Sequence, residues 1–386
     1  MDIKAIDKSY IAGTYARADV VFVSGKGSIL TDENGKDYID FGSGIAVNIL
    51  GHNFEPWKQA VLAQINQIAH TSNLYYSMPQ ARLAQKLNAL TGMKKVFFSN
   101  SGAEANECAI KCARKYSFDK YGEGRHKIIT LVNSFHGRTV ATLTATGQDS
   151  MHKYFNPFLD GFDYCPANDF KTLENKADDK TCAIMIELVQ GEGGVNALDI
   201  DFVKSVEKLC KKRDILLIVD EVQTGNGRCG KLYAYMNYGI QPDIVTTAKG
   251  LAGGLPLGAT MLWDKCQNTL TAGVHGSTFG GNPVACAGAS VILDNLTDEL
   301  LLSVAKKSQK IINALKGLKK VKSVTGLGLM LGVETEGIDT AEAVKSMREK
   351  GLVVLTAKSK IRLLPALNIS ESELDKGLEI MKEVLQ

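Results

Sequence analysis

The sequence predicts an α/β protein with a mostly parallel central sheet in a large domain and a smaller α/β domain formed from both chain ends. Short apolar runs such as KVFF, KIITLV and ILLIVD alternate with longer amphipathic stretches through the middle of the chain. This alternation is typical of repeated strand and helix units. Later, long helical patterns precede short strands. We expect residues 1–45 to join the small domain, residues 46–282 to form the large domain and residues 283–386 the small one.

The two chain ends carry local signals of their own. GSILTDENGKDYIDF has the pattern of a hairpin, and Asn34 with Gly35 supplies the dipeptide that tight hairpin turns prefer. A final helix is predicted after Ser370. We therefore expect strands as well as helices in the small domain.

Composition excludes several classes of function. The chain has 386 residues, with 45 Lys and Arg against 42 Asp and Glu and no strongly basic block, so nothing suggests a nucleic-acid partner. The N-terminus lacks an apolar signal sequence, and no apolar run approaches the roughly 18 residues of a membrane span. Eight cysteines without a CxxC pair are expected to be reduced, and six scattered histidines predict no metal site. We expect a cytoplasmic protein with small-molecule substrates.

One lysine stands in an otherwise chargeless run, TTAKGLAGGLPLGA. Lys249 follows a β-branched stretch, residues 244–247, that has the pattern of a buried strand. The glycines after it allow the backbone to approach a ligand closely. A solvated surface position is the alternative for any lysine, but these neighbours favour a lysine in a cleft.

A second strand ends in a carboxylate. Asp220 closes ILLIVD, and an ionised group after five aliphatic residues is costly unless a cation meets it. Parallel strands collect ligands at their carboxyl ends, so Asp220 and Lys249 can converge. A helix cap or a structural ion pair is the alternative. Together the two residues fit pyridoxal phosphate, which forms a Schiff base with lysine and needs an acid beside its ring nitrogen. Lys249 would then also move the proton.

Such a cofactor needs a phosphate site, and FFSNSGAEANE offers one. The strand leads into Ser101, Gly102 and Ala103 and then into a strong helix former, whose first N–H groups and dipole attract anions. The spacing of Ser101 and Glu104 also fits a capping box, and the two interpretations are compatible. By itself, this motif is weak evidence for a phosphate site.

Further polar loops follow other strands. In NSFHGRT, Phe135 could stack on a flat ring and Arg138 could bind a carboxylate, with a turn and a solvated arginine as the alternative. In ELVQGEGGV, Glu187 and Glu192 follow a strand, and solvated loop carboxylates are the alternative there. These loops open onto the same predicted edge of the sheet.

A competing motif is GNGRCG, residues 225–230, which matches the GxGxxG dinucleotide fingerprint. Residues 221–224 separate it from the strand, and GKLYAYMNYG is a poor helix to receive a pyrophosphate. Nicotinamide binding is therefore not favoured. No GxxxxGK[ST] sequence exists, which excludes a P-loop.

Six motifs in this order, NSGAEANE, FHGRT, QGEGGV, DEVQTGNGRCG, TTAKGLAGGLP and HGSTFGGNP, resemble the class III pyridoxal-phosphate aminotransferases. The resemblance covers nearly the whole chain. It implies the type I fold of pyridoxal-phosphate enzymes and a homodimer whose active sites lie at the subunit interface. Leu188 and Cys229 depart from the proline and threonine usual in the family, which puts the shape of two loops in doubt and removes no reacting group.

The resemblance also implies roles for residues at matching positions. Lys249 would bind the cofactor, Asp220 would pair with its ring nitrogen, and Thr278 would reach the phosphate in the other subunit. The implied cofactor-binding residues are Ser101, Gly102, Ala103, Phe135, Asp220, Gln223, Lys249 and Thr278. The implied substrate-binding residues are Tyr15, Arg138, Glu192, Ser277 and Arg362. Glu192 would pair with Arg362 whenever a substrate lacks the carboxylate that this arginine binds.

The implied reaction is a transamination in two halves, with N2-acetyl-L-ornithine as the expected amino donor and 2-oxoglutarate as the acceptor, a step of arginine synthesis. Ornithine, succinylornithine, 4-aminobutyrate and N-succinyl-diaminopimelate are competing donors. The competing hypotheses for the protein itself are an aminomutase or racemase of the same fold, a binding protein that has lost catalysis, and a nicotinamide-dependent oxidoreductase.

Overall fold

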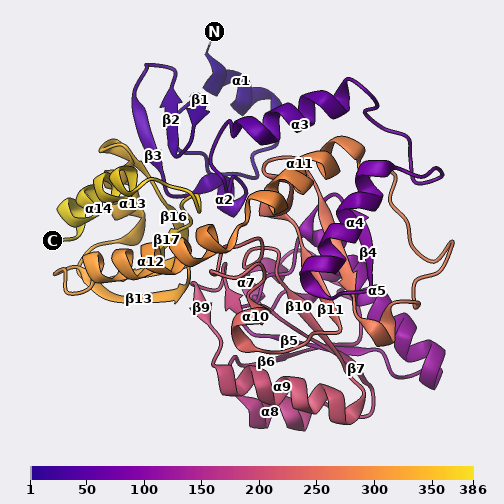
Figure 1. The fold of residues 1–386 in the computed structure, drawn as a ribbon. Coiled ribbons are helices and arrows are strands. Elements are labelled where there is room, and N and C mark those ends of the chain that lie inside the picture. Colours follow the sequence, from indigo (N-terminus) through magenta and orange to yellow (C-terminus); the bar gives the residue numbers. More distant parts are fainter. Residues whose placement is uncertain (1) are drawn as a thin grey trace.

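The computed structural model describes residues 2–386, and a seven-stranded sheet forms the centre of its larger part (Figure 1). Six strands run parallel, and β12 runs antiparallel to both of its neighbours, so the predicted mostly parallel sheet is confirmed. In spatial order the strands are β4 Lys95–Ser99, β12 Gly258–Leu262, β11 Ile244–Thr247, β10 Leu216–Asp220, β7 Thr181–Ile186, β5 Lys127–Leu131 and β6 Phe162–Cys165.

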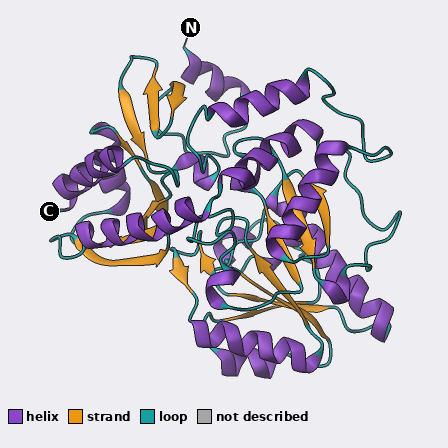
Figure 2. Ribbon diagram, viewed as in Figure 1, coloured by secondary structure: helices purple, strands orange, loops and turns teal. Residues whose placement is uncertain are grey.

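Helices cover both faces of this sheet (Figure 2). Alternate strand residues point to opposite faces. Thus Leu216 and Ile218 of β10 pack in one apolar cluster with α5 Gly102–Tyr121, whereas Leu217 and Val219 pack in another with α9 Ile200–Arg213. Because both faces are covered, the strands are continuous apolar runs. The other helices of this part are α3 Glu55–Ile65, α4 Met78–Thr91, α6 Val140–Ala145, α7 Asp149–His152, α8 Phe170–Lys176, α10 Tyr235–Tyr238 and α11 Pro283–Asn295.

Both chain ends contribute to one small sheet. The hairpin of β2 Ile29–Asp32 and β3 Asp37–Asp40 turns at Gly35, whose φ of 79° suits the Asn-Gly turn. β3 pairs in parallel with β15 Leu352–Val353, and β1 Phe22–Lys26 completes the sheet on the other side of β2. The N-terminal segment thereby lies beside the C-terminal part. The domain limits at residues 45 and 282 stay predictions.

A second small sheet carries the C-terminal strands. Its order is β13 Val321–Leu327, β14 Met330–Thr335, β17 Lys360–Leu363 and β16 Leu355–Ala357. α14 Glu371–Leu385 begins after a capping box formed by Ser370 and Glu373, as expected for the final helix. The remaining elements are α1 Ile3–Tyr10, α2 Ser43–Ala46, β8 Val189–Gln190, β9 Asn196–Ala197, α12 Asp298–Leu315, α13 Thr340–Glu349 and the 3₁₀ turns Lys249–Ala252 and Asp264–Cys266.

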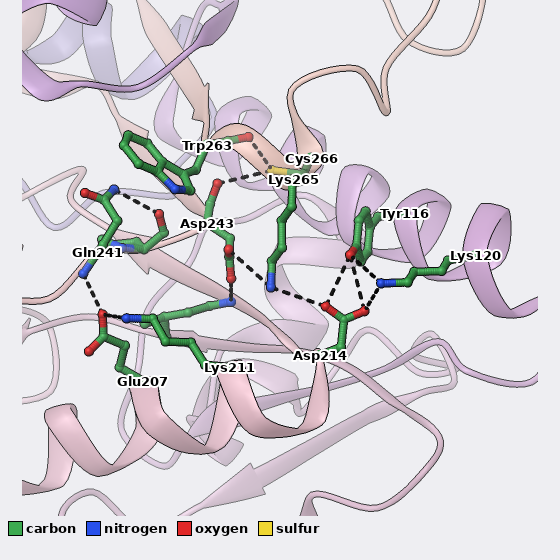
Figure 3. A network of polar contacts seen from close by, with 12 residues as sticks. Tyr116, Lys120, Glu207, Lys211, Asp214, Gln241, Asp243, Trp263, Lys265 and Cys266 are labelled. Carbon is green, nitrogen blue, oxygen red and sulfur yellow. Dashed lines mark hydrogen bonds and ion pairs between the residues drawn. The ribbon is translucent and has the colours of Figure 1, made fainter.

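The amino ends of β10 and β11 are held by a polar network (Figure 3). Asp214 ends α9 with a φ of 50° and accepts hydrogen bonds from Lys120 and Tyr121 at 2.8 and 2.5 Å. Lys265 lies 3.6 Å from Asp214 and 3.3 Å from Asp243, whose other oxygen accepts from the backbone N–H of Leu217. This edge is thus occupied by structural ion pairs, and the opposite edge holds the cavity described below.

The eight cysteines all lie within the described residues, where each is buried and unpaired. No helix within residues 2–386 is both long enough and apolar enough to span a membrane.

Candidate active site

A cavity of about 440 Å³ lies at the carboxyl ends of β4, β5, β7, β10 and β11. Loops that leave these strands line it, as expected where parallel strands end. Both Lys249 and Asp220 face this cavity. The predicted site residues that line it are Ser101, Gly102, Ala103, Phe135, Arg138, Asp220, Gln223 and Lys249.

Lys249 begins a 3₁₀ turn just after β11 and has a φ of 42°, in the left-handed region that non-glycine residues seldom adopt. The next residue must be glycine, because a Cβ on Gly250 would lie 2.7 Å from Ile49 Cγ2. Desolvation by the surrounding protein lowers the pKa of Lys249 to about 8, against the opposing effect of nearby Glu192. About a tenth of this amine is therefore neutral, and nucleophilic, at pH 7, far more than for an ordinary lysine.

Asp220, at the end of β10, is buried and held by three hydrogen bonds. Its Oδ2 accepts from Asn106 Nδ2 at 2.7 Å and lies 2.8 Å from His136 Nδ1, and its Oδ1 accepts from the backbone N–H of Val222 at 3.0 Å. Asn106 also donates to the His136 carbonyl at 2.7 Å, which ties α5 to the loop after β5. The carboxylate thus has a fixed orientation beside the cavity.

The amino end of α5 also faces the cavity. Ser101 caps this 20-residue helix by accepting from the Glu104 N–H at 3.1 Å, and Glu104 accepts from the Asn100 N–H at 2.6 Å. The first N–H groups of a helix, here those of Gly102 and Ala103, have no partner within it. They suit an anion, as the sequence predicted. Gly102 also needs its small size, because a Cβ there would lie 2.6 Å from Val222 Cγ1.

The loop after β5 is anchored by a carboxylate that follows the neighbouring strand β7. Glu187 Oε2, just after β7, accepts from the Phe135 N–H at 2.9 Å. Burial, with the nearby charge of Asp220, raises the pKa of Glu187 well above its usual value. The Arg138 guanidinium lies 5.5 Å from the Phe135 ring centre. An aromatic ring and an arginine are therefore presented together to the cavity.

Arg362 and Glu192 form an ion pair next to this cavity without lining it. Arg362, on β17, is buried, and its Nη1 lies 2.5 Å from Glu192 Oε1 and 3.2 Å from Gln223 Oε1. Burial raises the pKa of Glu192, but the charge and hydrogen bond of Arg362, together with the charge of Lys249, outweigh this effect and the net shift of the pKa is downward. The charges of both residues act on Lys249.

Besides Arg362 and Glu192, three more of the predicted substrate or cofactor residues lie outside the cavity. Ser277 is close, with its Oγ accepting from Asn100 Nδ2 at 3.3 Å. Thr278 borders a separate small hollow with Asn73 and its neighbours. Tyr15 is 71% exposed and packs against Arg17 in the N-terminal segment. A single chain does not bring Thr278 or Tyr15 to Lys249.

The structure adds residues to which the sequence assigned no role. His136 stood within the quoted motif NSFHGRT, and Asn106 interrupts the apolar face formed by Ala105, Cys108 and Ala109 of α5. The sequence feature that could have identified Asn106 is a polar residue on an otherwise apolar helix face. GNGRCG lines no part of the main cavity, and the helix near it, α10, has four residues. This excludes the dinucleotide arrangement, in which the motif opens a long helix.

The donor set fits pyridoxal phosphate. The cavity brings together an amine of lowered pKa, a fixed buried carboxylate, an aromatic ring and the free amides at the start of a helix. These are the groups needed to hold an aldehyde, a ring nitrogen, a flat ring and a phosphate. Within residues 2–386 no cluster of three or more His, Cys, Asp or Glu side chains is placed to hold a metal ion.

Known proteins with similar sequences support the same assignment. The family model for class III aminotransferases matches residues 10–385. The acetylornithine aminotransferase of Haemophilus ducreyi is 52% identical to this chain, over 99% of this chain and 98% of its own length. That of Caldanaerobacter subterraneus subsp. tengcongensis is 46% identical, over 98% of each chain.

Solved structures agree. The ornithine aminotransferase of Toxoplasma gondii superposes with a TM-score of 0.95 at 30% identity, covering 99% of this chain and 94% of that one. The N-acetylornithine aminotransferase of Stenotrophomonas maltophilia gives a TM-score of 0.86 at 33% identity, covering 98% and 97%. The chain therefore belongs to the class III aminotransferases, and it is a transaminase that uses pyridoxal phosphate.

Proposed function

We propose that this enzyme transfers the δ-amino group of N2-acetyl-L-ornithine to 2-oxoglutarate, giving N-acetyl-L-glutamate 5-semialdehyde and L-glutamate, a reaction of arginine biosynthesis. Relatives that are 40 to 52% identical to this chain bear the name acetylornithine aminotransferase. The observation that carries the proposal is the buried ion pair of Arg362 and Glu192 beside Lys249.

This pair allows one pocket to accept two unlike substrates. An amino donor that reacts through its δ-amino group brings no carboxylate next to the reacting carbon, so Arg362 stays neutralised by Glu192. 2-Oxoglutarate has a carboxylate beside its keto carbon, and that group can replace Glu192 on Arg362 by bidentate hydrogen bonds. Arg138, which faces the cavity, is left to bind the distant carboxylate of either substrate.

The residues around the cavity divide the chemistry among them. Pyridoxal phosphate, when bound, supplies the electron sink that makes the hydrogen on the amine-bearing carbon acidic. Lys249 holds the cofactor between turnovers, and its Nζ takes the proton from the substrate carbon when the amine has displaced it. Asp220 keeps a proton on the ring nitrogen. The amides of Gly102 and Ala103 would hold the phosphate, with Ser101 capping the helix, while Phe135 and Gln223, which line the same cavity, would hold the ring and its hydroxyl.

We also propose that the enzyme is a cytoplasmic homodimer with shared active sites. Large apolar side chains are exposed to solvent on the loop between α3 and α4, where Leu74 is 87% and Tyr75 71% exposed. Phe279, on the loop before α11, is 60% exposed. Such patches mark protein interfaces. A dimer that covers them can bring Thr278 to the phosphate of the partner's site, and it can enclose Tyr15 and Ser277 with substrate.

Ornithine is the second candidate donor, because the TM-score to the Toxoplasma gondii ornithine aminotransferase is 0.95. The two candidates are separated by steady-state kinetics with 2-oxoglutarate and each amine in turn, with the products identified by mass spectrometry. We expect kcat/KM for acetylornithine to exceed that for ornithine by at least about tenfold, which is a difference of roughly 1.4 kcal/mol in transition-state binding. A preference for ornithine would overturn the proposed donor.

A further inference from the structure

Arg228 is the largest of the fully buried side chains, and within residues 2–386 it forms no ion pair. Burial lowers its pKa to about 10, so the guanidinium stays charged at neutral pH. Its Nε and Nη2 have no hydrogen-bond partner in the described part of the chain. Burying a cation in this way is costly. We therefore expect Arg228 to have a role that compensates for the cost of its burial. The function proposed above gives Arg228 no such role.

The hydrogen-bond partners of the Arg228 side chain both belong to the C-terminal part of the chain. Its Nη1 donates to the carbonyls of Leu329 and Pro365, at 3.0 and 2.5 Å. Its own carbonyl accepts from the Leu329 N–H at 2.9 Å. The approach at this point is so close that a Cβ on Gly328 would lie 2.6 Å from the Arg228 carbonyl oxygen. Residues 225–230 are thus docked against the turn that joins β13 to β14.

Leu329 and Pro365 flank the two strands that position Arg362. Leu329 immediately precedes β14, Pro365 follows β17, and Arg362 on β17 lies opposite Gly332 of β14. One guanidinium therefore links the start of β14 to the exit from β17. The same connection carries Gln223, whose Oε1 accepts from Arg362 at 3.2 Å. These contacts tie the position of Arg362 to the loop that begins after Asp220.

We propose that Arg228 is a positioning residue that fixes Arg362 for binding the carboxylate beside the keto carbon of 2-oxoglutarate. Both carbonyls accept from one nitrogen, Nη1, which the planar guanidinium holds in a fixed position, whereas the ammonium of lysine ends a flexible four-carbon chain. The inference rests on the role of Arg362 in the proposed function. Loss of Arg228 should affect the 2-oxoglutarate half-reaction selectively, because Glu192, and not a substrate carboxylate, is paired with Arg362 while the amino donor reacts.

The test compares the two half-reactions of Arg228→Lys by stopped-flow absorbance of the bound cofactor. In the first, an amino donor accepted by the wild type is added to the loaded enzyme. In the second, 2-oxoglutarate is added to the aminated enzyme. We expect the 2-oxoglutarate concentration for half-maximal rate to rise about tenfold or more, since small displacements of a binding group have large kinetic effects. The donor half-reaction should stay within about twofold.

Two further variants separate positioning from loss of stability. In an Arg362→Lys background, Arg228→Lys should add no further change, because the group that it positions is gone. Arg125→Lys is the matched control: Arg125 bridges the carbonyls of Arg213 and Asp214 at 2.8 and 3.0 Å, at the opposite edge of the sheet. It should leave both half-reactions unchanged.

Three outcomes overturn the inference: equal effects of Arg228→Lys on both half-reactions, additive effects with Arg362→Lys, or loss of bound cofactor in both Arg228→Lys and Arg228→Gln. Failure of the proposed function looks different. A wild-type enzyme that reacts with 2-oxoglutarate and another amine, but not with acetylornithine, would refute the proposed donor and leave the Arg228 comparison intact.

Discussion

The Arg362 guanidinium is paired with the Glu192 carboxylate, with 2.5 Å between Nη1 and Oε1, while the same nitrogen also donates to Gln223. Arg362 is 4% exposed, whereas the Glu192 side chain is 27% exposed, so the arginine is the buried partner of the pair. Breaking a buried pair by removing one partner leaves an uncompensated charge, which is far more costly than losing a surface pair. A substrate can displace Glu192 only by offering a carboxylate in its place.

Glu192→Gln should therefore weaken the amino donor and spare the keto acid. With the amide in place, the charge of Arg362 faces a donor that brings no carboxylate to that position. We expect kcat/KM for acetylornithine to fall about tenfold or more, and the 2-oxoglutarate half-reaction to be unchanged or faster. Equal loss in both half-reactions, measured by stopped-flow absorbance, would be inconsistent with a gate.

Asn106→Ala should slow both half-reactions alike. It removes a hydrogen bond of 2.7 Å to Asp220 Oδ2 and the link to the His136 carbonyl, so the carboxylate beside the cofactor loses orientation. Losing such a supporting group typically costs about 10- to 100-fold in activity, and we expect a decrease of this size in kcat with KM nearly constant. A change confined to KM would instead indicate a role in binding substrate.

Attachment of cofactor to the apoenzyme should depend on pH through Lys249. Only the neutral amine attacks the aldehyde, and burial lowers the pKa of this lysine to about 8. The reconstitution rate, followed by the absorbance of bound cofactor, should rise as pH increases from about 6 and level off above about 8. An inflection near the ordinary lysine value of 10.5 would contradict the desolvated environment.

Glu221 should make stability fall as pH rises from 4.5 to about 7. Burial raises its pKa from 4.5 to about 7, so between these values the unfolded chain has released a proton that the folded chain retains. Its contribution is therefore greatest below the unfolded pKa and is lost as pH approaches the folded one, by on the order of 3 kcal/mol. Glu221→Gln should flatten urea-unfolding free energies across this window. An unchanged slope would show that another group is responsible.

The sequence predicts the centre of this site well because local patterns determine it. Apolar runs mark the strands. Asp220 ends one strand, and Lys249 and Ser101 stand two residues after two others, so all three lie at the edge where the carboxyl ends of these strands meet. The Asn34 and Gly35 turn is equally local. Each of these assignments needed only the few residues around it.

Other features depend on contacts between distant segments. The docking of Arg228 on Leu329 and Pro365 spans 101 and 137 residues, and no periodicity predicts it. GNGRCG was weighed as a ligand motif, whereas its glycines allow close packing: a Cβ on Gly227 would lie 2.8 Å from Leu367 Cδ1. Thr278 borders a separate hollow of this chain, and its proposed role depends on a second chain, which no local sequence pattern places.

The most direct test of the account is the visible absorption spectrum of the purified enzyme, recorded before and after acetylornithine is added without any keto acid. We predict an absorption band of lysine-bound cofactor that collapses to the aminated form with acetylornithine and returns on addition of 2-oxoglutarate, with ornithine and 4-aminobutyrate much less effective. A band that responds only to another amine would contradict the proposed donor. The absence of any band after reconstitution with pyridoxal phosphate would contradict the role of Lys249 and, with it, the central claim.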